Sequence, residues 1–283
     1  MTLQLDLALL ILLAAFAHAA WNALVKASGD QLLTFTMLRA VALAGGTVGA
    51  LLAPAPDAAS WPFLIASGIV HNAYYLLLLF SYRHGDLSLV YPIARGGAPV
   101  MVVAAAIPFA GEIPGPWGAL GIALISAGIF ALAFARGIPK GSGGTAIALA
   151  LATAVSIVAY TVTDGLGARR SGTAFGYAAW LFILESLPFL VFAAATRAQA
   201  FVAHARREWR RGLGGGLLMM LTYGLVIYAF TQGPLAYVSA LRETSILFAA
   251  ILGWAVLKES FGLRRIVAAL VIVAGIVLLQ LGG

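Results

Sequence analysis

The chain has 283 residues, of which 62% are hydrophobic and only 10% are charged, with 17 Lys and Arg against 10 Asp and Glu. Its mean hydropathy is +1.00. Soluble domains typically carry about 25% charged residues, so this composition excludes an ordinary soluble protein. Because Cys is absent, disulfides, thiolate metal sites and cysteine nucleophiles are excluded as well.

Ten apolar segments long enough to cross a bilayer follow one another along the chain, separated by breaks such as the one at 232–234. The expected spans are 5–25, 33–53, 61–80, 87–108, 117–135, 145–163, 174–196, 212–231, 235–257 and 264–281. The first run is preceded by Asp6 and by no base, unlike a signal peptide, so we expect it to be retained. The sequence predicts an all-α integral membrane protein with ten transmembrane helices.

The basic residues are distributed unequally between the two sets of loops. One set holds only Arg169 and Arg170, whereas the loops after spans one, three, five, seven and nine hold twelve bases. These twelve are Lys26, Arg83, Arg136, Lys140, Arg197, Arg206, Arg207, Arg210, Arg211, Lys258, Arg264 and Arg265. Because bases accumulate in cytoplasmic loops, we expect this side to be cytoplasmic in a plasma or inner membrane, with both termini outside. Placement in short loops also argues against nucleic acid as the partner of the net charge of +7.

Two stretches of the chain match each other without a gap, residues 95–132 and 242–279. Arg95 aligns with Arg242 and Glu112 aligns with Glu259. This fixed register predicts a duplication. The halves, 1–137 and 143–283, carry five spans each, and the odd number predicts that the second half is inserted in the opposite orientation. Secondary transporters commonly have such inverted repeats, with a substrate site near the midplane between them.

Several motifs resemble the EamA family of the drug/metabolite transporter superfamily. They are His18-Ala-Ala-Trp21-Asn22, Tyr91-Pro-Ile-Ala-Arg95-Gly96, Ala240-Leu-Arg242-Glu243-Thr244-Ser245, Gly111-Glu112 and Lys258-Glu259. The resemblance implies ten helices in two five-helix repeats around a central cavity, alternating access, and export of amino acids and related metabolites. It also implies cytoplasmic termini, whereas the distribution of bases places the termini outside.

Ionisable residues also lie inside predicted spans, where each charge costs about 2.5–3.5 kcal/mol to insert at the helix centre. Among them are Arg39, His71, Arg95, Glu185, Arg242 and Glu243. Arg95 and Arg242 approach the middle of the membrane from opposite faces, and a guanidinium suits a carboxylate or phosphate. We therefore expect these two arginines to bind an anionic group, and Glu243 to hold an ammonium group or a proton. The alternative is that the buried charges only neutralise one another.

The other candidate substrate-binding residues are polar or aromatic side chains within the spans: His18, Trp21, Asn22, His71, Asn72, Tyr75, Glu185 and Tyr223. Glu185 is expected either to couple transport to protons or to pair with an arginine. The alternative for Trp21 is an interfacial position at the membrane surface, and the alternative for Asn22 is a hydrogen bond between helices. Asp164 is interpreted as a helix-end residue, and Glu112 and Glu259 as turn-closing residues outside the site.

No catalytic or cofactor motif is present. The sequence lacks the metalloprotease His-Glu-x-x-His pattern and the nucleotide-binding Gly-x-x-x-x-Gly-Lys-Ser/Thr pattern. We therefore expect a transporter and no enzyme, with no cofactor or metal, coupled to a proton, an ion or the substrate gradient. Its partners would be a small polar substrate and membrane lipids, and the oligomeric state is left open. The alternative function is a flippase-like transporter of lipid-linked intermediates.

Overall fold

A computed structural model describes residues 4–84, 87–134, 144–257 and 262–281, and the regular structure in these ranges is entirely helical. Glu259, expected to repeat the role of Glu112, lies outside the described residues. In chain order the elements are α1 (Leu5–Lys26), α2 (Gln31–Leu52), η1 (Ala58–Ser60), α3 (Trp61–His84), α4 (Leu87–Ala110), α5 (Pro116–Ala133), α6 (Gly144–Arg169), α7 (Ala174–Thr196), α8 (Ala198–Gln232), α9 (Leu235–Glu243), α10 (Ser245–Leu257) and α11 (Leu263–Leu281).

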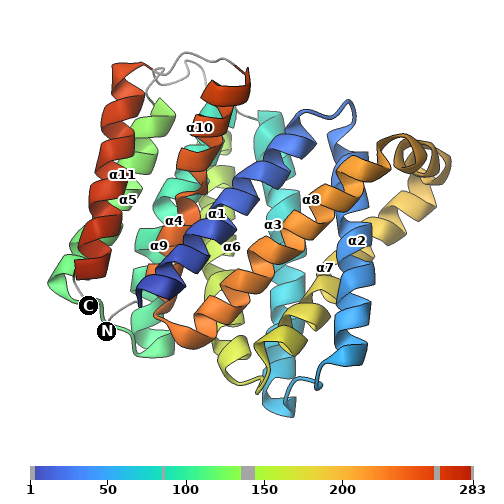
Figure 1. Cartoon of the computed structure of the whole chain (residues 1–283), viewed down its shortest axis with the longest axis horizontal. Coiled ribbons are helices and arrows are strands. Elements are labelled where there is room, and N and C mark those ends of the chain that lie inside the picture. The colour runs from blue at the N-terminus through green and yellow to red at the C-terminus, as the bar shows by residue number, and fades with distance from the viewer. Residues whose placement is uncertain (1–3, 85–86, 135–143, 258–261, 282–283) are drawn as a thin grey trace.

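Ten stretches of helix in the described ranges are long and apolar enough to cross a membrane, and they stand side by side (Figure 1). α9 and α10 together make the ninth span. Large apolar side chains such as Leu51 and Leu52 are exposed on the outside of the bundle, as expected for a surface that faces lipid. The prediction of an all-α integral membrane protein with ten transmembrane helices is confirmed.

The helix boundaries differ from the expected spans in three places. α6 continues past residue 163 to Arg169, α8 begins at Ala198 and not near 212, and a break at Thr244 divides the ninth span. Asp164 is therefore a buried residue within α6, which corrects its interpretation as a helix-end residue. Its burial is possible because neighbouring helices supply tyrosine hydroxyls, and sequence hydropathy does not register such partners.

The helices pack in pairs that bring the two halves of the chain together. α2 packs on α7, α4 on α9 and α5 on α11, while α3 packs on α6 and α1 on α8. α5 and α11 approach most closely at glycines, and they run alongside each other in Figure 1. A Cβ added to Gly121 would lie 2.7 Å from the carbonyl oxygen of Gly275. Small residues at this interface allow backbones to approach closely, which is how helices associate in lipid.

The connection between α1 and α2 is held by Asp30, which caps α2. One carboxylate oxygen of Asp30 accepts a hydrogen bond from the backbone N–H of Leu33 at 3.0 Å, and the other accepts one from Arg197 Nη2 at 2.8 Å. Both contacts stabilise the ionised carboxylate, so the pKa of Asp30 is lowered, mainly by the Leu33 N–H and to a lesser extent by Arg197.

Replacing Asp30 with alanine should lower the free energy of unfolding by about 1 kcal/mol, the usual cost of a lost N-cap. Because the folded-state pKa of Asp30 is lowered, its contribution is present at neutral pH and is lost as the pH falls through that pKa. Thermal unfolding of the detergent-solubilised protein at neutral and acidic pH measures both effects. Asp30→Asn is the matched control, because an amide oxygen still caps the helix. Equal loss in both variants would show that charge, and not capping, is responsible.

Candidate substrate site

Six charged side chains, in addition to Glu112, are buried within the bundle, and they come from α2, α4, α6, α7 and α9. The exposed fraction is 2% for Arg39, 5% for Arg95, 0% for Asp164, 3% for Glu185, 3% for Arg242 and 0% for Glu243. Charges at this depth are stable only when they are paired and hydrogen-bonded. The contacts divide them into two groups.

The arginine-rich group consists of Arg95 on α4 with Arg242 and Glu243 on α9. Arg95 Nη1 lies 2.9 Å from Glu243 Oε2, and Arg242 Nη2 lies 2.9 Å from Glu243 Oε1, so one carboxylate serves two guanidinium groups. Arg95 Nη2 also donates to His18 Nε2 at 3.1 Å, and Arg242 Nη2 donates to the Thr161 hydroxyl at 3.4 Å. With His18 accepting at Nε2, the group has two positive charges and one negative charge.

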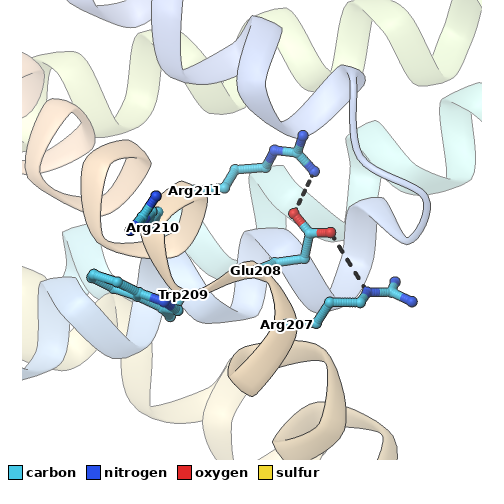
Figure 2. Close-up of a pocket in the computed structure, with 5 residues that line it drawn as sticks. All are labelled: Arg207, Glu208, Trp209, Arg210 and Arg211. Carbon is cyan, nitrogen blue, oxygen red and sulfur yellow. Dashed lines mark hydrogen bonds and ion pairs between the residues drawn. The ribbon is translucent and has the colours of Figure 1, made fainter.

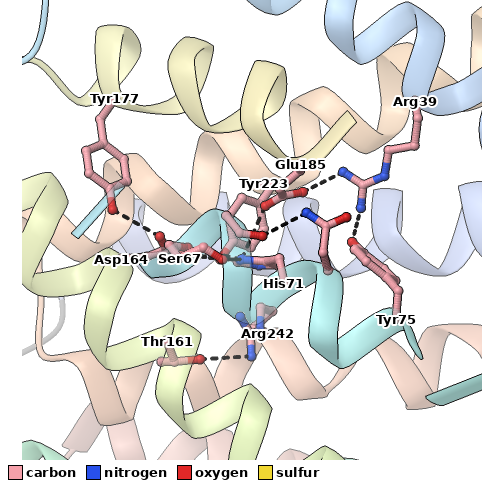
Figure 3. A network of polar contacts seen from close by, with 12 residues as sticks. Arg39, Ser67, His71, Tyr75, Thr161, Asp164, Tyr177, Glu185, Tyr223 and Arg242 are labelled. Carbon is pink, nitrogen blue, oxygen red and sulfur yellow. Dashed lines mark hydrogen bonds and ion pairs between the residues drawn. The ribbon is translucent and has the colours of Figure 1, made fainter. Parts of the chain in front are cut away.

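The carboxylate-rich group consists of Asp164 on α6 and Glu185 on α7, with Arg39 on α2 and His71 on α3. Arg39 Nη1 lies 2.5 Å from Glu185 Oε2, and Arg39 Nη2 donates to the hydroxyl of Tyr75. Figure 3 shows these side chains converging from four helices. Two carboxylates are thus balanced by a single guanidinium.

Asp164 is held by tyrosine hydroxyls from two further positions. Tyr177 donates to Asp164 Oδ1 at 3.1 Å, and Tyr223 donates to Oδ2 (Figure 3). His71 Nδ1 lies 3.3 Å from Glu185 Oε1 and 4.0 Å from Asp164 Oδ2. It also faces the backbone carbonyl oxygen of residue 67 at 3.1 Å. Because Nδ1 is surrounded by oxygen acceptors, we assign the ring proton to this nitrogen.

Tyr160 on α6 connects the two groups. Its ring stacks on His71 with centroids 4.0 Å apart, and the guanidinium carbon of Arg242 lies 5.4 Å from the centre of the same ring. The group with excess positive charge and the group with excess negative charge are therefore separated by one aromatic side chain. A cation over a tyrosine ring is a favourable contact in a desolvated site.

Three buried polar atoms in these groups have no hydrogen-bond partner among the described residues. They are Nη1 of Arg242 and Nε of Arg39, both donors, and Oε1 of Glu185, an acceptor that lies 3.3 Å from His71 Nδ1. A buried donor or acceptor without a partner costs about 1–3 kcal/mol, so its presence calls for an explanation. One open donor in the arginine-rich group and one open acceptor in the carboxylate-rich group are suited to receive a ligand.

Three of the candidate residues from the sequence lie outside these contacts. The side-chain amides of Asn22 and Asn72 donate to the carbonyl oxygens of His18 and Gly68, four residues earlier in their own helices. Trp21 packs against His18, with ring centroids 5.0 Å apart. The remaining candidates, His18, His71, Tyr75, Arg95, Glu185, Tyr223, Arg242 and Glu243, all belong to the two groups or contact them directly.

Sequence reasoning missed Asp164, Arg39 and Tyr160 as members of the site. Arg39 was recognisable as a charge inside a span, but its partners could not be identified because they come from α3 and α7. The glycines that follow Asp164 could have indicated that it lies at a packed interface between helices. α6 continues through Gly165 and Gly167, and the side chains of Leu235 and Tyr177 pack against these two glycines.

Glu112 ties the two halves of the chain together at one end of the bundle. Its Oε2 accepts the backbone N–H of Leu235 at 2.7 Å, and its Oε1 lies 2.6 Å from Arg169 Nη2. Arg169 also donates to the carbonyl oxygens of Phe230 and Gly233, at 2.8 and 2.7 Å. The expected structural role of Glu112 through a backbone hydrogen bond is present, but the backbone belongs to α9 and not to its own turn.

Residues 144–281 match the EamA-like transporter family. The second half of the chain therefore belongs to this family. The resemblance drawn from the motifs is thereby confirmed, and the protein is a membrane transporter of the drug/metabolite type. None of the curated proteins compared with this EamA-like transporter matches it.

The structure of this EamA-like transporter matches 26 chains among the solved structures. One of them, titled "Crystal structure of protein", superposes with a TM-score of 0.74 at 18% identity and covers 97% of this chain and 95% of its own. This likeness concerns the fold alone.

Proposed function

We propose that this transporter carries small zwitterions, such as amino acids and related metabolites, by alternating access. The observation that carries the proposal is the opposite charge imbalance of the two adjoining buried groups. Arg95 and Arg242 share one carboxylate, whereas Asp164 and Glu185 share one guanidinium. A molecule with a carboxylate at one end and an ammonium at the other complements both groups at once.

The substrate carboxylate would bind at the open Nη1 of Arg242, because a guanidinium offers a planar pair of donors to a carboxylate. The ammonium would bind between Glu185 Oε1 and Asp164. This differs from the expectation that Glu243 holds the ammonium, because both oxygens of Glu243 already face arginines. Glu243 instead keeps the two guanidinium groups together.

A proton is the coupling species that the geometry supports best. His71 Nδ1 contacts Glu185 and lies 4.0 Å from Asp164, so three titratable groups adjoin the proposed ammonium position. When no substrate is bound, one of these three groups would hold a proton, and an arriving ammonium group would displace it, so that the proton and the substrate occupy the position alternately. The direction we propose is export, as the family resemblance implies.

An inverted repeat of residues 1–137 and 143–283 is supported by reciprocal packing of α5 and α11. At the register that aligns Arg95 with Arg242, Ile125 corresponds to Ile272 and Gly128 corresponds to Gly275. A Cβ on Gly128 would lie 2.6 Å from Ile272 Cγ1, and a Cβ on Gly275 would lie 2.8 Å from Ile125 Cγ1. Such paired contacts are what a two-fold relation between halves would produce.

We further propose that the basic side of the bundle is cytoplasmic in a plasma or inner membrane. The start of α8 and the start of α11, with their arginines, lie at the same end of the bundle in Figure 1. This arrangement supports the assignment of the loops after spans one, three, five, seven and nine to one side. Labelling of single introduced cysteines from each side of intact cells tests it.

The functional test is counterflow of labelled amino acids into proteoliposomes, with wild type beside Arg242→Ala. Zwitterions should exchange, whereas the matched carboxylic acid and the matched amine should compete weakly. Arg242→Ala leaves the Arg95–Glu243 pair intact, so the variant should fold but lose at least tenfold in exchange at low substrate concentration. Arg264→Ala, at an exposed base of α11, is the control. Unchanged exchange in a correctly inserted Arg242→Ala variant would contradict the proposed site. A wild type that moves no zwitterion would favour lipid-linked substrates.

A further inference from the structure

Residues 198–211, at the start of α8, form a segment that turns away from the transmembrane part of the helix. The backbone of Glu208 leaves helical geometry, with φ −110° and ψ 19°, so that α8 bends near the end of this segment. In Figure 1 the beginning of α8 is seen almost along its axis, whereas the rest of α8 runs across the view. The segment therefore lies at a steep angle to the rest of α8, at the margin of the bundle beside α2 and α7 (Figure 1).

One face of this segment is fixed to the protein. His204 is buried, and its Nε2 lies 2.9 Å from the hydroxyl of Thr34 on α2. Just before the segment, Arg197 pairs with Asp30 at 2.8 Å. These contacts hold the segment against the end of α2, so its opposite face has a constant orientation toward the surroundings.

The outward face combines apolar side chains with bases. Val202 is 48% exposed and Trp209 is 55% exposed, while Arg206, Arg207 and Arg210 are also exposed. Tryptophan and arginine together are typical of the membrane–water interface, where the apolar part enters the lipid and the charge stays at headgroup level. This face thus suits the headgroup layer of the bilayer.

A hollow of about 410 Å³ opens at the kink, lined by Arg207, Glu208, Trp209, Arg210 and Arg211 (Figure 2). Its single carboxylate, Glu208, lies 2.7 Å from Arg211 and 3.6 Å from Arg207. Arg210 is not part of this pairing, and its guanidinium carbon lies 5.3 Å from the centre of the Trp209 ring. Three guanidinium groups and one carboxylate leave an excess of positive charge in the hollow.

We propose that this hollow is a binding site for the phosphate headgroup of an anionic phospholipid. The phosphate accepts hydrogen bonds from Arg210, on the side of the helix that carries Trp209, and the acyl chains lie along Trp209 and Val202. Arg207, on the other side of the helix in Figure 2, adds positive charge that attracts the headgroup. Arg211 stays with Glu208 and supports the site. The site is separate from the buried charges of the transport pathway, so it stands independently of the proposed substrate.

The test is native mass spectrometry of the full chain purified in neutral detergent and mixed with equal amounts of phosphatidylglycerol and phosphatidylcholine. Wild type should retain phosphatidylglycerol in preference. A base near the surface contributes a factor of about five to anionic-lipid binding, so Arg207→Gln/Arg210→Gln should retain roughly 30-fold less. The double variant keeps the Glu208–Arg211 pair. Arg264→Gln/Arg265→Gln removes two bases elsewhere on the same side and should retain as much lipid as wild type.

The proposal is overturned if the Arg207→Gln/Arg210→Gln variant retains phosphatidylglycerol like wild type, or if the control variant loses as much. It is also overturned if glycerol phosphate displaces the lipid at equal concentration, because the hollow would then be a site for soluble phosphates. If the double variant unfolds, Arg210→Glu alone decides the question, since Arg210 is exposed and should exclude the anionic headgroup once its charge is reversed.

Discussion

Replacing Glu243 with glutamine should lower the free energy of unfolding by about 3–5 kcal/mol, the range observed when one member of a buried ion pair is removed. The physical reason is that Arg95 and Arg242 both depend on this carboxylate, at 2.9 Å each. Without it, two buried guanidinium groups would face each other with no compensating charge. Thermal unfolding in detergent, followed by circular dichroism and by the fraction that stays monodisperse on size-exclusion chromatography, measures the loss.

The matched variants for this prediction change the charge balance of the arginine-rich group. Arg242→Gln should cost less than Glu243→Gln, because Arg95 and Glu243 then form a balanced pair. The double variant Arg242→Gln/Glu243→Gln should be more stable than Glu243→Gln alone, because it removes one of the two uncompensated positive charges. If Glu243→Gln unfolds at the same temperature as wild type, the arginine-rich group does not depend on Glu243 as its counter-ion.

Replacing Gly121 with alanine should lower the free energy of unfolding by about 1–3 kcal/mol, the usual cost of overpacking a dense interface. The new Cβ would lie 2.7 Å from the carbonyl oxygen of Gly275 and 2.8 Å from the backbone nitrogen of Leu279. Both neighbours are backbone atoms, so α5 and α11 must move apart and lose contacts along their whole interface. Thermal unfolding in detergent gives the size of the effect.

Gly214→Ala provides the comparison for this second prediction. A Cβ at Gly214 meets no atom within 4 Å, and alanine is the better helix former, so this variant should be as stable as wild type or slightly more stable. A Gly121→Ala protein with unchanged stability would mean that α5 and α11 can separate at no cost. The two helices would then not form a fixed contact between the halves of the transporter.

The number and approximate positions of the membrane spans could be predicted from the sequence, and the departures have identifiable causes. Residues 198–211 were expected to be a loop because they are rich in bases, but they are helical because their charges point outward and His204 anchors the inner face. Asp164 was expected at a helix end because a carboxylate interrupts the apolar pattern. Its partners, Tyr177 and Tyr223, come from other helices and leave no mark on the local sequence.

The candidate site was predictable in part. The sequence placed Arg95 and Arg242 near the middle of the membrane, and the structure brings both to Glu243. It did not indicate that Glu243 would be occupied by both arginines, or that Arg39 and Glu185 would pair in a second group. These pairings join residues as far apart in the chain as 39 and 185. The spacing of residues along one helix does not reveal which residues of other helices they contact.

The sequence by itself determined that the protein lies in a membrane and that its secondary structure is helical. An apolar stretch of about 20 residues in lipid must satisfy its backbone hydrogen bonds internally, and therefore forms a helix. The tertiary structure alone decided which face of each helix meets which neighbour. In lipid the hydrophobic effect does not orient a helix, so close packing at glycines and a few buried polar contacts fix the rotation of each span. Those same contacts create the two charged groups of the candidate site.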